Sequence, residues 1–96
     1  MSAYCFFDIL KITDSEKMEN YRSRVLDNVE KHGGRYLVVG GKFKVWEGDW
    51  QPTFPVIIEF PSLEQAQEWY DSEDYAELKA LRLAATVSNA VAIQGM

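Results

Sequence analysis

Three charged residues of this chain, Arg35, Glu59 and Arg82, stand among apolar neighbours and are its first candidates for chemistry. Arg35 follows a helix stop and opens an apolar stretch, so we expect its guanidinium to be half-buried. Glu59 stands between Ile58 and Phe60, where burying an unpaired carboxylate is costly, so it needs a cationic partner or a raised pKa. Arg82 falls on the inner or flanking side of the last expected helix and is the third member of this group.

Two interpretations of this charged group remain open at the level of sequence. In the first, Glu59 forms a structural salt bridge with one of the arginines, because buried ion pairs commonly serve packing and specificity. In the second, Arg35 or Arg82 binds the carboxylate or enolate of a substrate while Glu59 moves the proton. No catalytic residue is assigned, and the three residues are candidates for substrate binding.

Four aromatic residues, Tyr21, Trp69, Tyr70 and Tyr75, fall on helix faces that are expected to turn toward the sheet. Core packing explains most such residues. A buried Tyr or Trp nevertheless needs a partner for its O–H or N–H group, so we also consider a pocket with polar groups between the helices and the sheet. Trp69 and Tyr75 are therefore added to the candidates for substrate binding.

The single histidine and the single cysteine restrict the chemistry further. His32 ends the first expected helix, where an imidazole is favoured by the helix dipole, so we interpret it as a cap. Cys5 lies in an apolar strand and is expected to be an inert core thiol. One His and one Cys cannot supply a zinc site or a two-His-one-carboxylate iron site within a chain, so neither a metal nor a cofactor is expected.

The length of 96 residues predicts one domain, spanning residues 1–96. A domain of this size has a small core and marginal stability, so added stability from a partner subunit is plausible. The net charge of −5 and the absence of Lys or Arg runs argue against nucleic acid and against an anionic membrane surface. A lone cysteine fits a reducing compartment, and no apolar run approaches the roughly 18 residues of a membrane span. We therefore expect a cytoplasmic protein whose partner is a small molecule or a protein.

The expected secondary structure positions these candidates. Residues 3–12 are apolar at both alternating positions, which is typical of a strand covered on both faces. Thr13-Asp14-Ser15-Glu16 and Ser62-Leu63-Glu64-Gln65 have the pattern of a helix start, and Gly33-Gly34 ends the first helix. The remaining pattern predicts strands over residues 35–39, 54–60 and 87–94, an extension of the second strand over 42–46, and helices over 62–70 and 72–85.

This βαββαβ order is that of the ferredoxin-like unit, an α+β fold with a four-stranded antiparallel sheet and helices on one face. The first and third strands are expected to be central because they are the most apolar. Helices on one face leave the other apolar face of the sheet open, so something else must cover it. A second copy's sheet is the simplest cover, and we predict a homodimer.

At these residues the chain resembles the domain of unknown function 1330 family, which belongs to the dimeric α+β barrel group. The resemblance covers nearly the whole chain. It rests on Thr13-Asp14, Tyr21, Gly34-Arg35-Tyr36-Leu37-Val38, Gly40-Gly41, Glu47-Gly48, the segment from Val56 to Ser62, Ser72 with Tyr75, and Arg82.

The resemblance implies a dimeric α+β barrel, whereas the chemistry of the family is itself unassigned. The wider group includes cofactor-free monooxygenases, isomerases and haem-handling enzymes. Val39 and Phe54 stand where the family commonly has arginine, so the expected cleft is less basic. We predict a protein with a small-molecule cleft between sheet and helices. The alternatives are a cofactor-independent monooxygenase or isomerase acting on a small aromatic or organic acid, and a non-catalytic dimerisation module.

Overall fold

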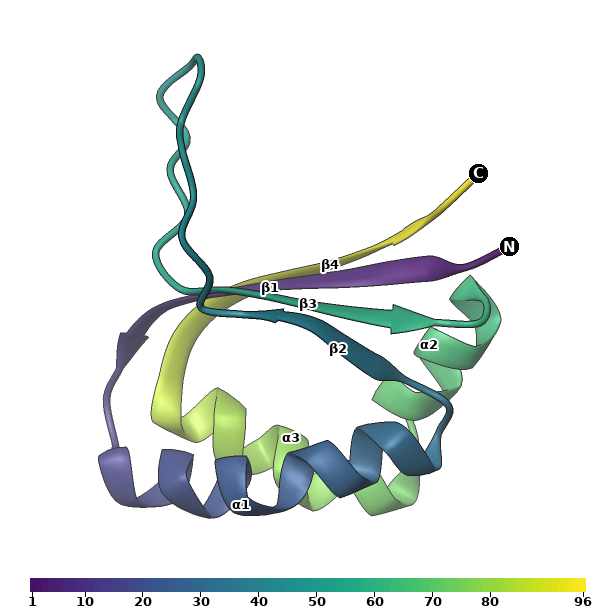
Figure 1. Cartoon of the computed structure of the whole chain (residues 1–96). Coiled ribbons are helices and arrows are strands. Elements are labelled where there is room, and N and C mark those ends of the chain that lie inside the picture. The colour runs from purple at the N-terminus through teal and green to yellow at the C-terminus, as the bar shows by residue number, and fades with distance from the viewer.

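The computed structural model describes all residues from 1 to 96 and has the predicted βαββαβ order, with the second helix divided in two. The elements are β1 (Ala3–Ile12), α1 (Ser15–Lys31), β2 (Arg35–Val39), β3 (Pro55–Phe60), α2 (Leu63–Tyr70), α3 (Glu73–Ala85) and β4 (Thr86–Gln94). The strands form one antiparallel sheet in the order β2-β3-β1-β4 (Figure 1). The first and third strands are therefore central, and the predicted ferredoxin-like fold is confirmed.

The predicted helix starts are confirmed by their capping side chains. The side-chain oxygens of Asp14, Ser62 and Ser72 each accept a hydrogen bond from the backbone N–H three residues later, which satisfies donors that the first helical turn leaves free. His32 is the C-cap of α1, and Gly33 follows with a φ of 84°, a left-handed conformation that favours glycine. None of the helices has the length and apolar character needed to cross a membrane.

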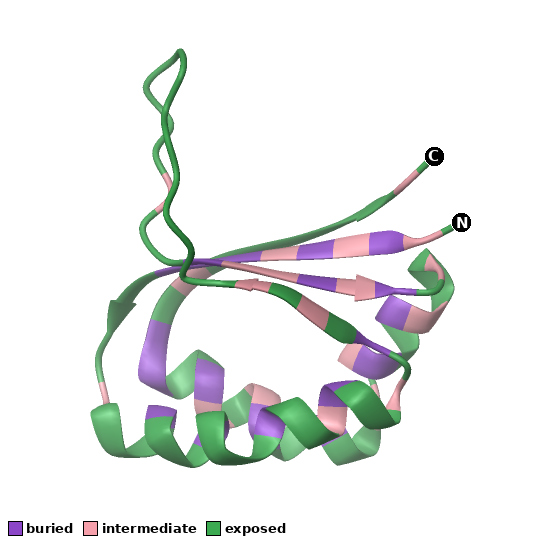
Figure 2. Cartoon of the chain, in the orientation of Figure 1, coloured by how far each residue is buried: buried purple, intermediate pink, exposed green.

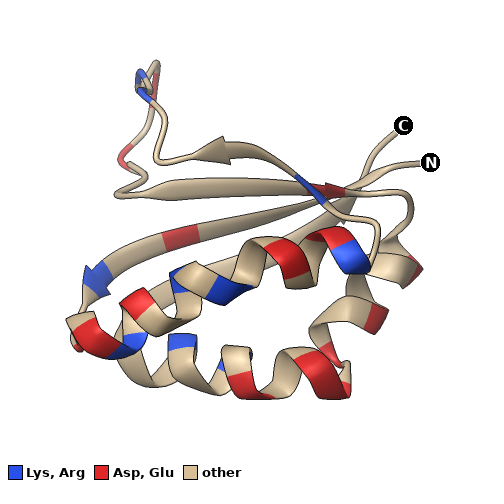
Figure 3. Ribbon diagram, turned by 60° about the horizontal axis from the view of Figure 1, so that its bottom comes forward, with Lys and Arg blue, Asp and Glu red and all other residues tan.

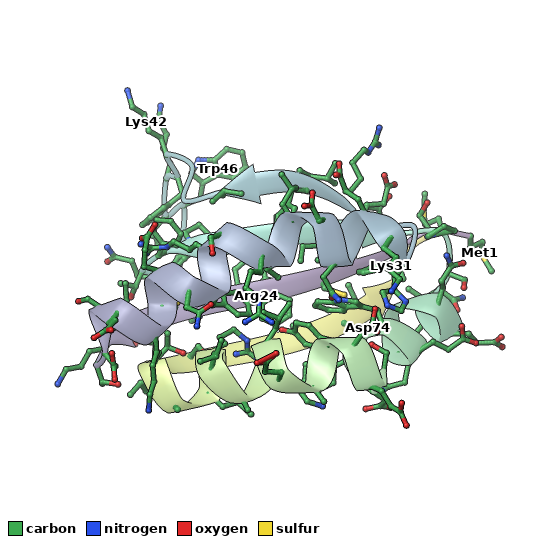
Figure 4. The ribbon with its side chains drawn as sticks, turned by 90° about the horizontal axis from the view of Figure 1, so that it is seen from below. Met1, Arg24, Lys31, Lys42, Trp46 and Asp74 are labelled. Atoms are coloured by element: carbon green, nitrogen blue, oxygen red, sulfur yellow. The ribbon has the colours of Figure 1, made fainter.

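Ion pairs join α1 to α3. Arg24 Nη2 lies 2.6 Å from Glu77 Oε2, and Asp74 contacts both Lys31 Nζ at 3.0 Å and His32 Nε2 at 2.9 Å. The hydrogen bonds to Asp74, that of Lys31 first, hold the pKa of its carboxyl well below the usual range. The charged residues lie mainly on the helices (Figure 3), and Lys31 and Asp74 meet at one end of the helical layer (Figure 4).

The core lies between the helices and one face of the sheet (Figure 2). The central strands turn Cys5, Phe7, Ile9, Ile58 and Phe60 toward the helices, and all five are buried. The helices contribute the other buried members of this core: Met18, Tyr21, Val25, Val29, Ala66, Trp69, Tyr75, Leu78 and Ala85.

The opposite face of the sheet, called here the outer face, has no helix on it (Figure 1). It is nevertheless apolar, with Tyr4 and Phe6 of β1, Ile57 of β3, and Val91 and Ile93 of β4 in register. Val91 and Ile93 are 61% and 63% exposed, whereas the three residues on the central strands are half-buried. The prediction that the sheet has a second apolar face without helices on it therefore holds, and this face lacks a cover.

The predicted extension of the second strand over residues 42–46 is wrong. β2 ends at Val39, and residues 41–54, called here the arm, rise from the outer face away from the helices (Figure 1). Gly40 has a φ of 63°, which turns the chain out of the line of β2. Because no strand lies beside residues 42–46, their backbone groups have no ladder to join and they do not form a strand.

The base of the arm is held by Asp8, a buried residue of β1 on the outer face. Its Oδ1 atom accepts hydrogen bonds from the backbone N–H groups of Thr53 at 2.8 Å and Phe54 at 2.9 Å. The ring of Trp50 also leans on Phe6, with 5.9 Å between ring centroids. Asp8 therefore fixes the direction in which the arm leaves the sheet.

Candidate functional site

The structure places the sequence-predicted site residues on two sides of the sheet. Arg35 and Glu59 face outward, opposite each other on β2 and β3 and in line with Tyr4 on β1. Arg82 lies under the sheet, at the end of α3, in the helix-facing layer. The structure therefore does not bring Arg82 to Glu59, and the three charges do not form one cluster.

Arg35 and Glu59 form a salt bridge with 2.6 Å between Nη2 and Oε1. The Arg35 side chain is 73% exposed, so the expectation of a half-buried guanidinium is wrong: β2 is one of the two edge strands, and this face of it is open to solvent. The hydrogen bond from Arg35 lowers the pKa of Glu59, with smaller contributions from Ser2 and Tyr4. Glu59 is thus a paired, ionised carboxylate rather than a buried acid with a raised pKa.

A cavity of about 390 Å³ opens between α1 and the helix-facing side of β1, β2 and β3. Its walls are largely apolar and include Phe7, Ile9, Met18, Val25 and Ile58. These side chains occupy the inward positions of their strands and of α1, so the pattern that builds the core also shapes the cavity. Such a cavity has the size and character of a small-ligand site.

Arg82 is the only buried positive charge in this cavity, with a residue exposure of 3%. Its Nη1 atom donates to Ser88 Oγ at 3.0 Å, and its guanidinium lies over the ring of Phe7, 5.1 Å from the centroid. Its Nε and Nη2 atoms are buried without a hydrogen-bond partner. Because buried donors are nearly always paired in proteins, these two N–H groups mark a place for an acceptor.

Tyrosine hydroxyls gather around this arginine. The hydroxyl oxygens of Tyr21 and Tyr75 lie 3.0 Å apart, and Tyr36 reaches the same cavity from β2. Burial, and then the proximity of Tyr75, raises the pKa of Tyr21 and of Tyr36 above the usual range. Burial lowers the pKa of Arg82, but the neighbouring hydroxyls of Tyr75 and Tyr21 outweigh that effect, and the net pKa is raised.

These shifts define what the cavity can do chemically. The guanidinium remains charged and the phenols remain neutral, so both act as hydrogen-bond donors near neutral pH. Neither a carboxylate nor an imidazole lines the cavity, so its walls offer cationic and hydrogen-bonding groups but no ordinary general base. No group of three or more His, Cys, Asp or Glu side chains is placed to hold a metal ion.

Trp69 and Tyr75 belong to a packed aromatic cluster, with 4.3 Å between their ring centroids. They are 1% and 0% exposed, and Trp69 Nε1 donates to Asn28 Oδ1 at 2.9 Å. Trp69 does border a second, smaller cavity of about 240 Å³ beside β4 and Cys5. Trp69 does not line the larger cavity, although Phe7 lines both cavities. Tyr75 is linked to the larger cavity through its hydroxyl bond with Tyr21.

Sequence reasoning missed Tyr36, Arg22 and Ser88 as members of this site. The sequence could have indicated Tyr36, because successive residues in a strand face opposite sides of the sheet and Tyr36 follows Arg35. Arg22 is half-exposed on α1 and also lines the cavity, most of whose other lining residues are apolar. Ser88 had no sequence signal, since its bond to Arg82 depends on how β4 returns beside α3.

Comparisons with known proteins agree with this architecture. The model of a family described as a domain of unknown function, DUF1330, matches residues 2–96. A protein of unknown function from Rhodopseudomonas palustris is 18% identical, with a TM-score of 0.75 over 99% of this chain and 82% of that chain. SnoaB, a cofactor-independent oxygenase from Streptomyces nogalater, is 10% identical, with a TM-score of 0.63 over 99% of this chain and 91% of that chain. No curated protein matches the chain in sequence.

Proposed function

The chain belongs to the domain of unknown function 1330 family and has a ferredoxin-like α+β fold, and from this premise we propose that it binds a small molecule in the cavity under the sheet. The observation that carries this proposal is the cavity of about 390 Å³, with apolar walls and few polar groups. Ligand sites in proteins commonly have this composition and a volume of about 300 to 1,000 Å³.

Ligand binding is tested by blocking the opening of the cavity. Val39 lines the cavity and is 62% exposed, so Val39→Trp fills the opening with little cost to the core. Val87 on β4 is 51% exposed and lines no cavity described above, so Val87→Trp is the matched control. Calorimetry with benzene and naphthalene derivatives, both neutral and acidic, should detect binding that Val39→Trp weakens and Val87→Trp leaves unchanged. Failure of the whole panel to bind the wild-type protein would contradict the proposal.

We also propose that the chain forms a homodimer through the outer face of the sheet. The support is the row of apolar side chains on this face, which includes Val91 and Ile93, because large exposed apolar patches mark interaction sites in soluble proteins. The arm stands on the same face and carries Trp46, which is 91% exposed, and Trp50, which is 68% exposed. A second copy is the natural occupant, since an isologous interface pairs one patch with itself.

The dimer is tested by sedimentation at micromolar concentration. Val91→Glu places a charge on the outer face and should yield a folded monomer. Leu83→Glu is the matched control, because Leu83 is 59% exposed but lies on α3 in the helical layer, so it should leave the dimer intact. Ile58 is unsuitable for this purpose, since it faces the helices and is 2% exposed. A wild-type protein that sediments as a monomer would contradict the proposed interface.

A second candidate function is a cofactor-independent monooxygenase or isomerase acting on a small aromatic or organic acid. It is favoured by the fold shared with SnoaB, a cofactor-independent oxygenase, together with the cavity under the sheet. Oxygen uptake and product analysis, with each compound that binds, distinguish this candidate from simple binding. If no compound binds and the dimer persists, a non-catalytic dimerisation module becomes the better description.

We place the protein in the cytoplasm. Its one cysteine, Cys5, is buried and free, which is usual in a reducing compartment. Fractionation of cells that express the tagged protein tests this placement, and recovery from a secreted or membrane fraction would contradict it.

A further inference from the structure

We infer that the cavity under the sheet selects an apolar ligand with one carboxylate, and that Arg82 binds this carboxylate through its Nε and Nη2 atoms. This inference rests on the proposed small-molecule function and names the class of ligand. It begins from the two buried N–H groups of Arg82 that lack a partner, whereas Nη1 already donates to Ser88.

The pair of unpartnered atoms determines the shape of the missing acceptor. The Nε–H and Nη2–H bonds lie side by side on one edge of a guanidinium and point in nearly the same direction. A carboxylate presents two oxygens with matching spacing, which is why arginine and carboxylate so often form two parallel hydrogen bonds. A neutral alcohol or ketone offers a single uncharged oxygen to this edge and cannot form two parallel, charge-assisted hydrogen bonds.

The charge of the cavity favours the same ligand. None of the salt bridges in the protein includes Arg82, so its positive charge has no internal counter-ion. Arg22 adds a second guanidinium to the cavity wall, and its pairing with Glu19 is long at 3.8 Å. A buried charge without a counter-ion is costly, so an anion that enters the cavity is favoured over a neutral molecule of the same shape. The cavity is thus locally positive within a chain whose net charge is −5.

The remainder of the ligand is specified by the apolar walls. The guanidinium of Arg82 lies over Phe7, and apolar side chains such as Ile9, Val25 and Ile58 line the cavity together with Val39, which is largely exposed. Val39 and Phe54 add only apolar surface to the cavity wall, so its positive charge is carried by the two arginines. A flat hydrophobic body with the acid group at one end fits this distribution of charge.

The test compares 2-naphthoate with 2-naphthalenemethanol, which has a similar ring system and no charge. We expect calorimetry to show that the wild-type protein binds naphthoate roughly 10- to 100-fold more tightly, the range expected for charge-assisted hydrogen bonds. Arg82→Met should remove this preference while leaving the binding of the alcohol unchanged. Arg35→Met is the matched control, because it removes an arginine from the outer face and should preserve the preference.

Arg82→Lys provides a second variant in case Arg82→Met does not fold. It keeps a buried cation but loses the paired N–H groups, so it should retain only part of the preference for naphthoate. Equal binding of both compounds by the wild-type protein, or a preference that survives in Arg82→Met, would overturn the inference and leave the proposed cavity function standing. Binding of neither naphthalene compound would overturn the inference, and failure of the broader panel as well would overturn the proposed function.

Discussion

Arg35 and Glu59 lie directly opposite each other on β2 and β3, with 2.6 Å between Nη2 and Oε1. This ion pair stands beside an irregularity in the ladder, where the register of β2 shifts between Tyr36 and Val38. β2 is an edge strand with a single neighbour, so its register depends on few contacts. The pair therefore serves to hold the edge strand in place rather than to form part of the cavity, which lies on the other side of the sheet.

A double-mutant cycle measures this coupling. Glu59→Gln and Arg35→Gln should each lower stability by a small amount, because the Arg35 side chain is largely exposed and solvent screens the pair. The double variant should lose less than the sum of the single losses in urea unfolding. Additive losses would show that the two residues are not coupled.

The same coupling should depend on pH. Arg35 holds the pKa of Glu59 below its usual value of 4.5 in the folded protein, so the pair stabilises the fold above pH 4.5. This contribution is lost as the pH falls through the folded pKa of Glu59. The cycle should therefore give measurable coupling at pH 7 that declines as the pH falls well below 4.5. Coupling that stays constant over this range would indicate that Glu59 is not the titrating partner.

The sequence predicted correctly the structural features that depend on residues close together in the chain. Asp14, Ser62 and Ser72 cap helices within the predicted helix starts, although the first cap is Asp14 and not Thr13, the first residue of the predicted pattern. These starts were predictable because a cap needs only the next three residues. The two apolar faces of β1 were also predicted from alternation alone. The order of the strands and the need for a second cover on the sheet followed from these local patterns.

The features that the sequence did not predict depend on how strands far apart in the chain pair with one another. Whether residues 42–46 form a strand depends on a neighbouring strand, which the structure does not provide. The side of the sheet on which Arg35 lies depends on how β2 pairs with β3, and a one-residue slip would reverse it. Arg82 and Glu59 were grouped because both are charges among apolar residues, but the sheet separates them.

The turn into the arm gives the next prediction. Gly40 has a φ of 63°, and a Cβ atom there would meet the ring of Phe54 at less than van der Waals distance. Gly40→Ala should therefore destabilise the protein by about 1 to 3 kcal/mol and loosen the base of the arm. Urea unfolding and limited proteolysis at residues 41–54 measure these two effects.

Gly41→Ala is the control for that substitution. Gly41 has no left-handed φ, and its nearest side-chain atom, on Val38, would lie 3.4 Å from the new Cβ. We expect a change in stability smaller than about 0.5 kcal/mol and an unchanged proteolytic pattern. Equal effects of the two substitutions would contradict the turn geometry.

The reactivity of Cys5 should report its burial. Burial raises the pKa of its thiol from 9.0 to about 11, and the thiolate is the reactive form. The rate of alkylation by iodoacetamide should therefore continue to rise with pH beyond 9 in the native protein. In urea the same rate should reach half its maximum near pH 9, the ordinary pKa of the thiol. A native rate with its midpoint also near pH 9 would mean that Cys5 titrates like an exposed thiol.

For Trp69 the sequence left two roles open, that of a core residue and that of a residue lining a ligand cleft. Its ring is 1% exposed and packs against Phe60 and Tyr75, with centroids 5.2 Å and 4.3 Å away. Trp69→Ala should cost about 3 to 5 kcal/mol in urea unfolding, because it leaves a cavity and removes the partner of Asn28. Trp50→Ala is the matched control, since Trp50 is 68% exposed on the arm and should cost about 1 kcal/mol or less.

Binding measurements on variants of Trp69 then show whether this residue belongs to the core or lines the ligand site. If Trp69 is core, Trp69→Phe should retain most of the stability and should bind naphthoate as the wild-type protein does, because Trp69 does not line the larger cavity. A loss below about 1.5 kcal/mol in Trp69→Ala, together with weakened ligand binding in Trp69→Phe, would instead place the ligand in the smaller cavity beside β4. Arg82→Met would then leave binding unchanged, so the two variants together identify which cavity is occupied.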